Sequence, residues 1–144
     1  MNKQTLSAKD YLSQAYRIDQ RINSKIEQIS SLRDLAAKAT STLGDVPPSG
    51  TRNVCRMEDI ICKIVDMETE INFDIDGLVD LKREIITIIK SVSNPEYHTI
   101  LELRYLCFKS WEQIAVDMRY SIHHLYKMHS AALEACDRLL KHDT

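Results

Sequence analysis

The stretch SWEQIAVDMRYSIHHLYKM, residues 110–128, sets the architecture of the C-terminal third of this chain. Ser110 is a helix-capping residue, and Ile114 and Met118, four residues apart, would share the inner face of a short helix. Ser121 would cap a second helix after a turn at Arg119. The inner face of that helix would carry the apolar residues at helical spacing: Ile122, Leu125, Met128, Ala132 and Leu133. Two short helices joined by so tight a turn predict a helix-turn-helix.

The side chains of the second helix that point away from this core are the candidate DNA contacts. In a helix-turn-helix, the second helix lies in the major groove with its N-terminal residues at the base edges. The turn contributes to the same surface, and two basic residues of the preceding segment flank it. The predicted DNA-binding residues are Arg104, Lys109, Arg119, Ser121, His123, His124, Tyr126 and Lys127.

Together with the preceding helix, residues 100–133 resemble region 4 of the primary-type bacterial sigma factors, the module that reads a promoter's upstream element. The resemblance is carried by ILELRY at 100–105, SWEQIA at 110–115, the Ser121 cap and Ala132-Leu133. Within this class, a short chain with a helical N-terminal half is most similar to the small phage-encoded regulators of late transcription in prophages of Gram-positive bacteria. The resemblance implies a transcription regulator whose partners are double-stranded DNA and RNA polymerase.

Two features differ from the sigma pattern. Arg119 stands where the turn usually has glycine, so it must accept a left-handed backbone or the turn must be of another kind. The second helix also lacks a run of basic residues, and residues 94–144 carry six Lys or Arg against seven Asp or Glu. A plain three-helix core without DNA binding therefore remains an alternative for this motif.

Composition favours an all-α protein, because 144 residues with three glycines and three prolines leave little turn chemistry for a sheet. The net charge of −2 excludes a polycation that coats nucleic acid, so any DNA contact must be local. No secretory signal or membrane-length apolar span is present, and the cysteines (Cys55, Cys62, Cys107 and Cys136) form no Cys-x-x-Cys pair. We expect a cytoplasmic protein without membrane contact.

Motifs for catalysis are missing from the sequence. It has no Gly-rich phosphate loop, no nucleophile elbow and no metal-ligand pair at helical spacing. All five histidines lie in the C-terminal third, near Cys107 and Cys136, but their spacing fits no standard zinc finger. We expect no enzymatic activity, cofactor, metal or small-molecule substrate.

The N-terminal two thirds contain two heptad seams that alternate spacings of three and four. A loop is predicted between them at residues 44–55, because Pro47 and Pro48 exclude helix there. The first seam comprises Ala8, Tyr11, Ala15, Ile18, Ile22, Lys25, Ile29, Leu32, Ala36, Ala39 and Leu43. The second comprises Met57, Ile60, Ile64, Met67, Ile71, Asp74, Leu78, Leu81, Ile85, Ile88 and Val92.

Antiparallel pairing of the two seams places Lys25 opposite Asp74, the one charged residue of each seam. The layers then join Leu32 to Met67, Ile29 to Ile71, Ile22 to Leu78 and Ile18 to Leu81. Residues 1–42 carry seven Lys or Arg against four Asp or Glu, and residues 57–93 carry four against nine, which favours this pairing. The sequence thus predicts a coiled-coil hairpin over residues 1–93, with Lys25 and Asp74 setting its register. The alternative is that each helix lies separately on a larger helical core.

A second apolar row on the returning helix is not used by the hairpin: Ile61, Val65, Ile75, Val79, Ile86 and Ile89. We expect it to mediate homo-oligomerisation, with contact to the C-terminal helices near Ile86 and Ile89. Asn94 as a cap and Pro95 at the first helical position mark the start of a helix-turn-helix DNA-binding domain over residues 94–144. Its first helix should direct Ile100, Leu103, Leu106 and Cys107 inward.

The sequence therefore predicts an all-α fold with a long antiparallel hairpin and a C-terminal helix-turn-helix. The leading hypothesis is a sequence-specific DNA-binding transcription regulator. The alternative function is a coiled-coil adaptor or phage assembly protein that binds only protein. In that case His123, His124 and Lys127 would form a solvated face.

Overall fold

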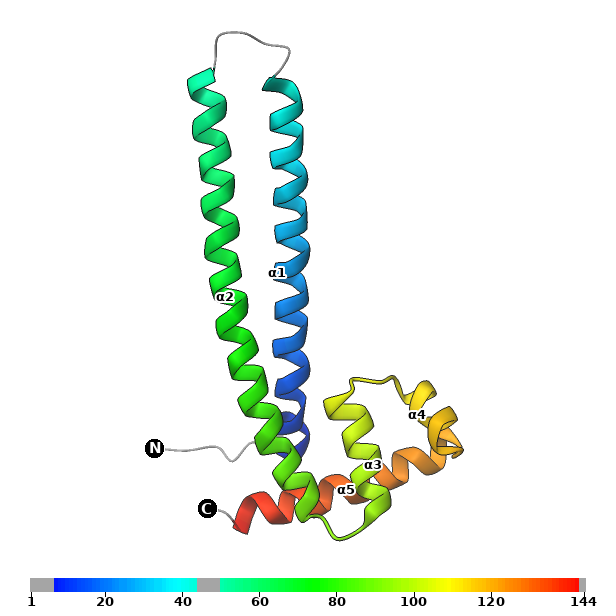
Figure 1. Cartoon of the computed structure of the whole chain (residues 1–144). Coiled ribbons are helices and arrows are strands. Elements are labelled where there is room, and N and C mark those ends of the chain that lie inside the picture. The colour runs from blue at the N-terminus through cyan, green and yellow to red at the C-terminus, as the bar shows by residue number, and fades with distance from the viewer. Residues whose placement is uncertain (1–6, 44–49, 143–144) are drawn as a thin grey trace. The chain divides into compact units, whose positions relative to one another are not determined.

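The computed structural model describes residues 7–43 and 50–142, and its regular structure in these ranges is entirely helical (Figure 1). The all-α prediction is confirmed for this part of the chain. The elements are α1 (Ala8–Leu43), α2 (Gly50–Ser91), α3 (Pro95–Leu101), a π-helical turn η1 (Glu102–Leu106), α4 (Trp111–Met118) and α5 (Ile122–His142). Within the described ranges, no helix has the length and apolar content needed to cross a membrane.

The chain divides into two compact units, and both long helices pass from one to the other. The core unit comprises Met1–Ile18 and Leu78–Thr144, and the paired-helix unit comprises Asp19–Gly77. This grouping differs from the predicted boundary at residue 93. The reason is that Ala8, Leu12 and Ala15 on the first turns of α1 are buried in one apolar cluster with the C-terminal helices.

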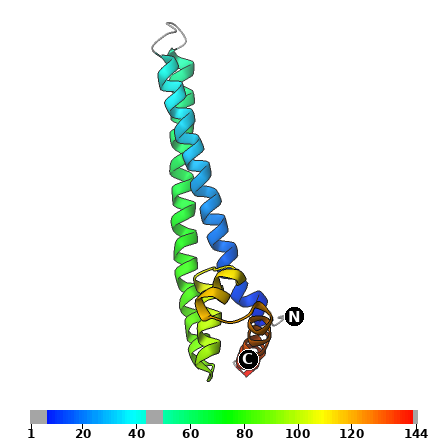
Figure 2. The same ribbon diagram turned by 90° about the vertical axis from the view of Figure 1, so that its right-hand side faces the viewer.

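In the paired-helix unit, α1 and α2 lie side by side and run in opposite directions (Figure 1, Figure 2). Lys25 Nζ lies 2.7 Å from Asp74 Oδ2, so the two residues expected to set the register are in contact. Arg33 and Glu68 form a second, exposed ion pair at 3.0 Å. The apolar interior of the unit includes Ile22, Ile29, Met67 and Ile71, all from the two predicted seams.

The predicted loop at 44–55 is too long, because α2 begins at Gly50. Proline restricts its own residue and the one before it, but it does not prevent the following residues from entering a helix. Pro47 and Pro48 therefore place no limit on residues 50–55. Residues 44–49 lie outside the described part of the chain.

In the core unit, side-chain oxygens accept hydrogen bonds from the first N–H groups of two helices. At α3, Asn94 Oδ1 accepts a hydrogen bond from the backbone N–H of Glu96 at 2.9 Å, with Pro95 at the first helical position, which confirms the predicted cap. At α1, the backbone N–H of Ala8 donates to Asp137 Oδ1 at 2.7 Å. A carboxylate on α5 thus satisfies a free N–H group at the positive end of α1.

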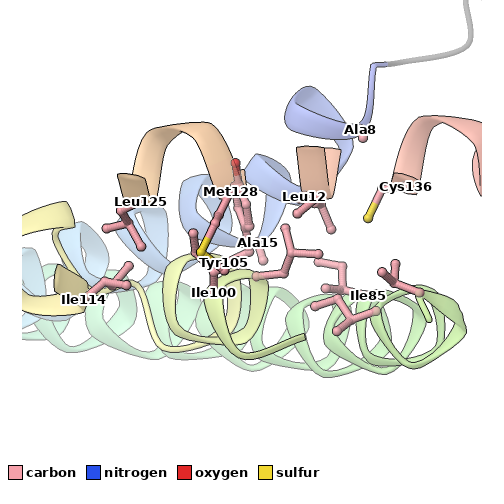
Figure 3. Close-up of a cluster of buried hydrophobic side chains, with 14 residues drawn as sticks. Ala8, Leu12, Ala15, Ile85, Ile100, Tyr105, Ile114, Leu125, Met128 and Cys136 are labelled. Atoms are coloured by element: carbon pink, nitrogen blue, oxygen red, sulfur yellow. The ribbon is translucent and has the colours of Figure 1, made fainter. Parts of the chain in front are cut away.

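The apolar core draws fully buried side chains from all five α-helices (Figure 3). The largest are Leu12, Ile85, Ile89, Ile100, Leu101, Ile114, Leu125 and Cys136. The expected contact with the C-terminal helices is confirmed for Ile89, which is fully buried in this core. The prediction that Ile89 mediates oligomerisation is therefore wrong. The other five residues of that row, Ile61, Val65, Ile75, Val79 and Ile86, are exposed.

Candidate nucleic-acid interface

Helices α4 and α5 each begin at a serine cap, and a left-handed residue ends α4 between them. Ser110 Oγ accepts the backbone N–H of Gln113 at 3.2 Å, and Ser121 Oγ accepts that of His124 at 3.1 Å. Arg119 has φ 60° and ψ 40°, so it accepts the left-handed backbone itself. The N–H of Tyr120 then donates to the carbonyl of Ala115 at 3.1 Å and closes the end of α4.

The N-terminal half of α5 has a buried face and a polar exposed face. Leu125 and Met128 are buried against the core, whereas Ser121, His123, His124, Tyr126 and Lys127 are exposed. Arg119 is exposed beside them. Ile122 was expected to point inward, but its side chain is 40% exposed. It is the first residue of α5, and the buried face of the helix begins at Leu125.

Two predicted flanking residues are already engaged within the chain. Lys109 Nζ lies 2.8 Å from Asp117 Oδ2, and this hydrogen bond raises the pKa of Lys109 and lowers that of Asp117. Arg104 Nη1 donates to the backbone carbonyl of Lys109 at 3.0 Å. Its guanidinium carbon lies 4.6 Å from the centre of the Trp111 ring. Neither side chain extends freely beside α5.

A π-helical turn places Arg104 and its neighbours. The N–H of Cys107 bonds to the carbonyl five residues back, that of Glu102, at 3.0 Å. A π-turn accommodates one extra residue and rotates the side chains that follow. Tyr105 is consequently buried, whereas Cys107, which was expected to point inward, is exposed.

The segment then reverses at Phe108, which has φ 58°. A left-handed backbone costs a residue with a Cβ about 1–2 kcal/mol, so side-chain contacts must hold it. Phe108 makes an edge-to-face contact with Tyr16 of α1 at 5.6 Å between ring centres. Lys82 Nζ lies 4.9 Å from the centre of the Phe108 ring and donates to the carbonyl of Leu106 at 3.2 Å.

Beside α5, these elements enclose a cavity of about 390 Å³ within the core unit. Its lining from the segment 104–111 consists of Arg104, Tyr105, Phe108 and Trp111. The first turns of α1 contribute Lys9, Ser13 and Tyr16. From α5 it receives Tyr126, which also belongs to the predicted DNA-binding surface, and His129.

His129 and Tyr105, which both line this cavity, form a buried polar pair. Tyr105 Oη lies 2.6 Å from His129 Nε2. Burial raises the pKa of Tyr105 to about 12, so the hydroxyl keeps its proton and donates to the ring nitrogen. Burial, together with the positive charges of Arg104 and Lys9, lowers the pKa of His129 to about 4. The imidazole is therefore neutral at pH 7.

The cavity residues were missed as a site in the sequence, although one signal pointed to His129. It follows Leu125 by four residues and precedes Ala132 by three, which are spacings of one face of a helix. Lys9, Ser13 and Tyr16 gave no such signal, because only the packing of α1 brings them to α5. No group of three side chains suited to a metal ion occurs in the described ranges.

Comparison with known proteins places the chain in a family. Neither the curated proteins nor the solved structures include a match. Residues 45–137 match the family described as "Protein of unknown function (DUF1492)", a range that spans α2 through most of α5. Because this match covers more than half of the sequence, the chain belongs to the DUF1492 family.

Proposed function

We propose that this protein is a sequence-specific DNA-binding transcription regulator of phage or prophage origin. It would read double-stranded DNA with the first two turns of α5. The observation that carries the proposal is the capped turn between α4 and α5. The left-handed Arg119 and the Ser121 cap leave His123, His124, Tyr126 and Lys127 exposed together at the start of a helix whose other face is buried. This is the presentation that major-groove reading requires.

Local charge supports the proposal better than the charge of the whole chain. Arg119 and Lys127 are the charged residues between residues 119 and 133, and no carboxylate occurs in that stretch. Ser, His and Tyr side chains around them can donate or accept hydrogen bonds at base edges and phosphates. With few cations, the surface would depend on base contacts more than on counterion release.

The proposed arrangement is a helical hairpin that carries a helix-turn-helix of the sigma region 4 type in the cytoplasm. The hairpin would act as a spacer and, through the exposed row on α2, as an element for homo-oligomerisation. RNA polymerase is the second partner in this proposal, because the sequence resembles a module that acts within that enzyme.

Selection of bound duplexes tests the proposal. Purified protein is mixed with random duplex DNA, and the retained fragments are sequenced and their affinity measured at several salt concentrations. We expect an enriched motif and an affinity that falls with salt, with a slope set by a small number of phosphate contacts. Retention of fragments without any enriched motif, or no retention at low salt, would contradict sequence-specific binding.

The second candidate is a coiled-coil adaptor or phage assembly protein that binds only protein. It is favoured by the large apolar side chains exposed on α2, among them Ile61, Val65 and Phe73. Apolar surface of this kind commonly marks a protein-binding face. In this case the selection would yield no motif, and changes to His123, His124 and Lys127 would leave all binding unchanged.

A further inference from the structure

The cavity of the core unit combines aromatic walls with positive charge. Its volume of about 390 Å³ falls in the range of small-molecule sites, which is roughly 300–1,000 Å³. Five of its nine lining residues are Tyr, Phe or Trp, and two are basic. No carboxylate from the described part of the chain lines it.

Trp111 is the centre of the aromatic wall. Its ring makes edge-to-face contacts with Tyr126 at 5.4 Å and with His129 at 4.5 Å between ring centres. The guanidinium of Arg104 lies over the same indole at 4.6 Å. This fixes the orientation of the indole and sets a cation beside it, where a flat ring can make offset or edge-to-face contacts.

The two cations of the cavity, Arg104 and Lys9, remain able to bind an anion. Arg104 is described with one hydrogen bond, from Nη1 to the carbonyl of Lys109, although a guanidinium has five N–H donors. No carboxylate in the described ranges forms an ion pair with Arg104 or with Lys9. Both cations line the cavity, and their positive charges lower the pKa of His129, a third lining residue.

His129 adds a neutral donor. Nε2 accepts the Tyr105 hydroxyl at 2.6 Å, so the proton of the uncharged imidazole is on Nδ1. Nδ1 has no protein partner in the described part of the chain. Every side-chain nitrogen or oxygen that is fully buried there does have a partner, so Nδ1 is not fully buried. Nδ1 is therefore accessible, and because His129 lines the cavity, it can donate to a bound oxygen.

We propose that this cavity binds a small ligand that joins a flat ring to a carboxylate or phosphate group. The ring would lie against Trp111 and Tyr126, and the anion would be held by Arg104 and Lys9. Aromatic walls favour the flat ring, and a planar guanidinium with a nearby ammonium favours an oxyanion. This inference goes beyond DNA binding and does not depend on it.

Trp111 is the single tryptophan of the chain, so its fluorescence reports on the cavity directly. The full-length protein is titrated without DNA with two probes, benzoate and adenosine monophosphate. The controls are benzamide and adenosine, which have the ring without the anion, and acetate and inorganic phosphate, which have the anion without a ring. We expect a saturable change with at least one probe and none with the controls at the same concentration. The better of the two probes is then used with the variants.

Lys9→Met removes one charge from the cavity and keeps an aliphatic side chain. Because a charge-assisted contact is lost, it should weaken binding of the better probe about tenfold. Lys90→Met, at an exposed lysine of the same unit that does not line the cavity, should leave binding unchanged. Circular dichroism and the melting temperature confirm that both variants fold.

Three outcomes would overturn the proposal. They are no saturable change with either probe up to about 10 mM, equal binding of a probe and its neutral counterpart, or equal binding by the wild type and a folded Lys9→Met variant. Because the titration contains no DNA, a failure here is distinct from a failure to select a DNA motif.

Discussion

Lys25 Nζ lies 2.7 Å from Asp74 Oδ2 across the interface of α1 and α2, and it lies 3.4 Å from Glu70 Oε2. The Lys25 and Asp74 side chains are 19% and 11% exposed, so most of their surface is withdrawn from water. The hydrogen bond to Asp74 raises the pKa of Lys25. A charge left here without its partner would be poorly compensated, so we expect the pair to influence the register of the two helices.

Reversal of either charge should therefore destabilise the paired-helix unit. We expect Lys25→Glu and Asp74→Lys each to lower the melting temperature, and the double swap to recover part of the loss. Reversal of Arg33 and Glu68, an exposed pair on the same two helices, should show a smaller coupling because exposed ion pairs contribute little. If the double swap lowers the melting temperature by as much as the two single changes added together, the pair does not set the register.

The sequence was most informative where structure depends on local periodicity. Ile29 and Ile71, one from each heptad seam, are buried, because a regular helix repeats the same face. The burial of Leu12 was missed, because the cluster that buries it includes residues more than seventy positions away in the sequence. The exposure of Cys107 was missed because a π-turn changes the helical period.

The candidate site was predicted in the same uneven way. The exposed side chains of α5 followed from the Ser121 cap and the positions of Leu125 and Met128. The cavity beside them could not be predicted. It combines segments that are distant in sequence, and it depends on the left-handed backbone of Phe108, a residue whose side chain ordinarily disfavours that conformation.

Leu12 tests the contribution of α1 to the core unit. Its side chain is 0% exposed, so Leu12→Ala should lower the free energy of unfolding by about 2–5 kcal/mol through lost burial and a new cavity. Leu35→Ala, on the same helix at 51% exposure, should change it by about 0.5 kcal/mol or less. Denaturant unfolding measures both. Equal effects would show that the start of α1 is not part of the core.

Acid should destabilise the protein through His129. The folded-state pKa is lowered to about 4 from 6.5, so between these values the unfolded chain binds a proton that the folded chain does not. Stability is therefore lost as the pH falls from about 6.5 to about 4, by about 2–3 kcal/mol.

His129→Gln isolates this contribution, because the amide can still accept the Tyr105 hydroxyl but has no charge to gain. Denaturant unfolding of both proteins at pH 7 and pH 5 is the measurement. We expect a smaller acid loss in the variant than in the wild type. If the free energy of unfolding falls equally in both proteins between pH 7 and pH 5, the acid sensitivity comes from another group.

The exposed row on α2 should mediate self-association. Ile61, Val65, Ile75 and Val79 are each more than 40% exposed, and a monomer would leave them in water. Light scattering at micromolar concentration should report at least a dimer. The double variant Val65→Lys, Ile75→Lys should be a monomer. The control Leu35→Lys, at an exposed leucine of α1, should associate like the wild type. A wild-type monomer would exclude this role for the row.

The α5 surface provides the sharpest test of the proposed function, because base contacts and phosphate contacts respond differently to mutation. On a selected site at fixed salt, His123→Ala, His124→Ala, Tyr126→Ala and Lys127→Ala should each cost about 1–3 kcal/mol and relax the sequence preference wherever the side chain reads a base. Arg119→Ala should instead weaken all sequences alike and lower the salt slope by about one, as expected for a phosphate contact.

Arg138→Ala is the matched control, since Arg138 is exposed on α5 but lies beyond the turns that enter a groove. The Arg138→Ala variant should bind DNA with the affinity and the sequence preference of the wild type. The side chains of His123 and Lys127 are exposed and lie outside the core, so these two variants should keep the wild-type melting temperature. If binding is unchanged in all five surface variants, DNA is not read by α5, and the protein-binding function becomes the better account of this surface.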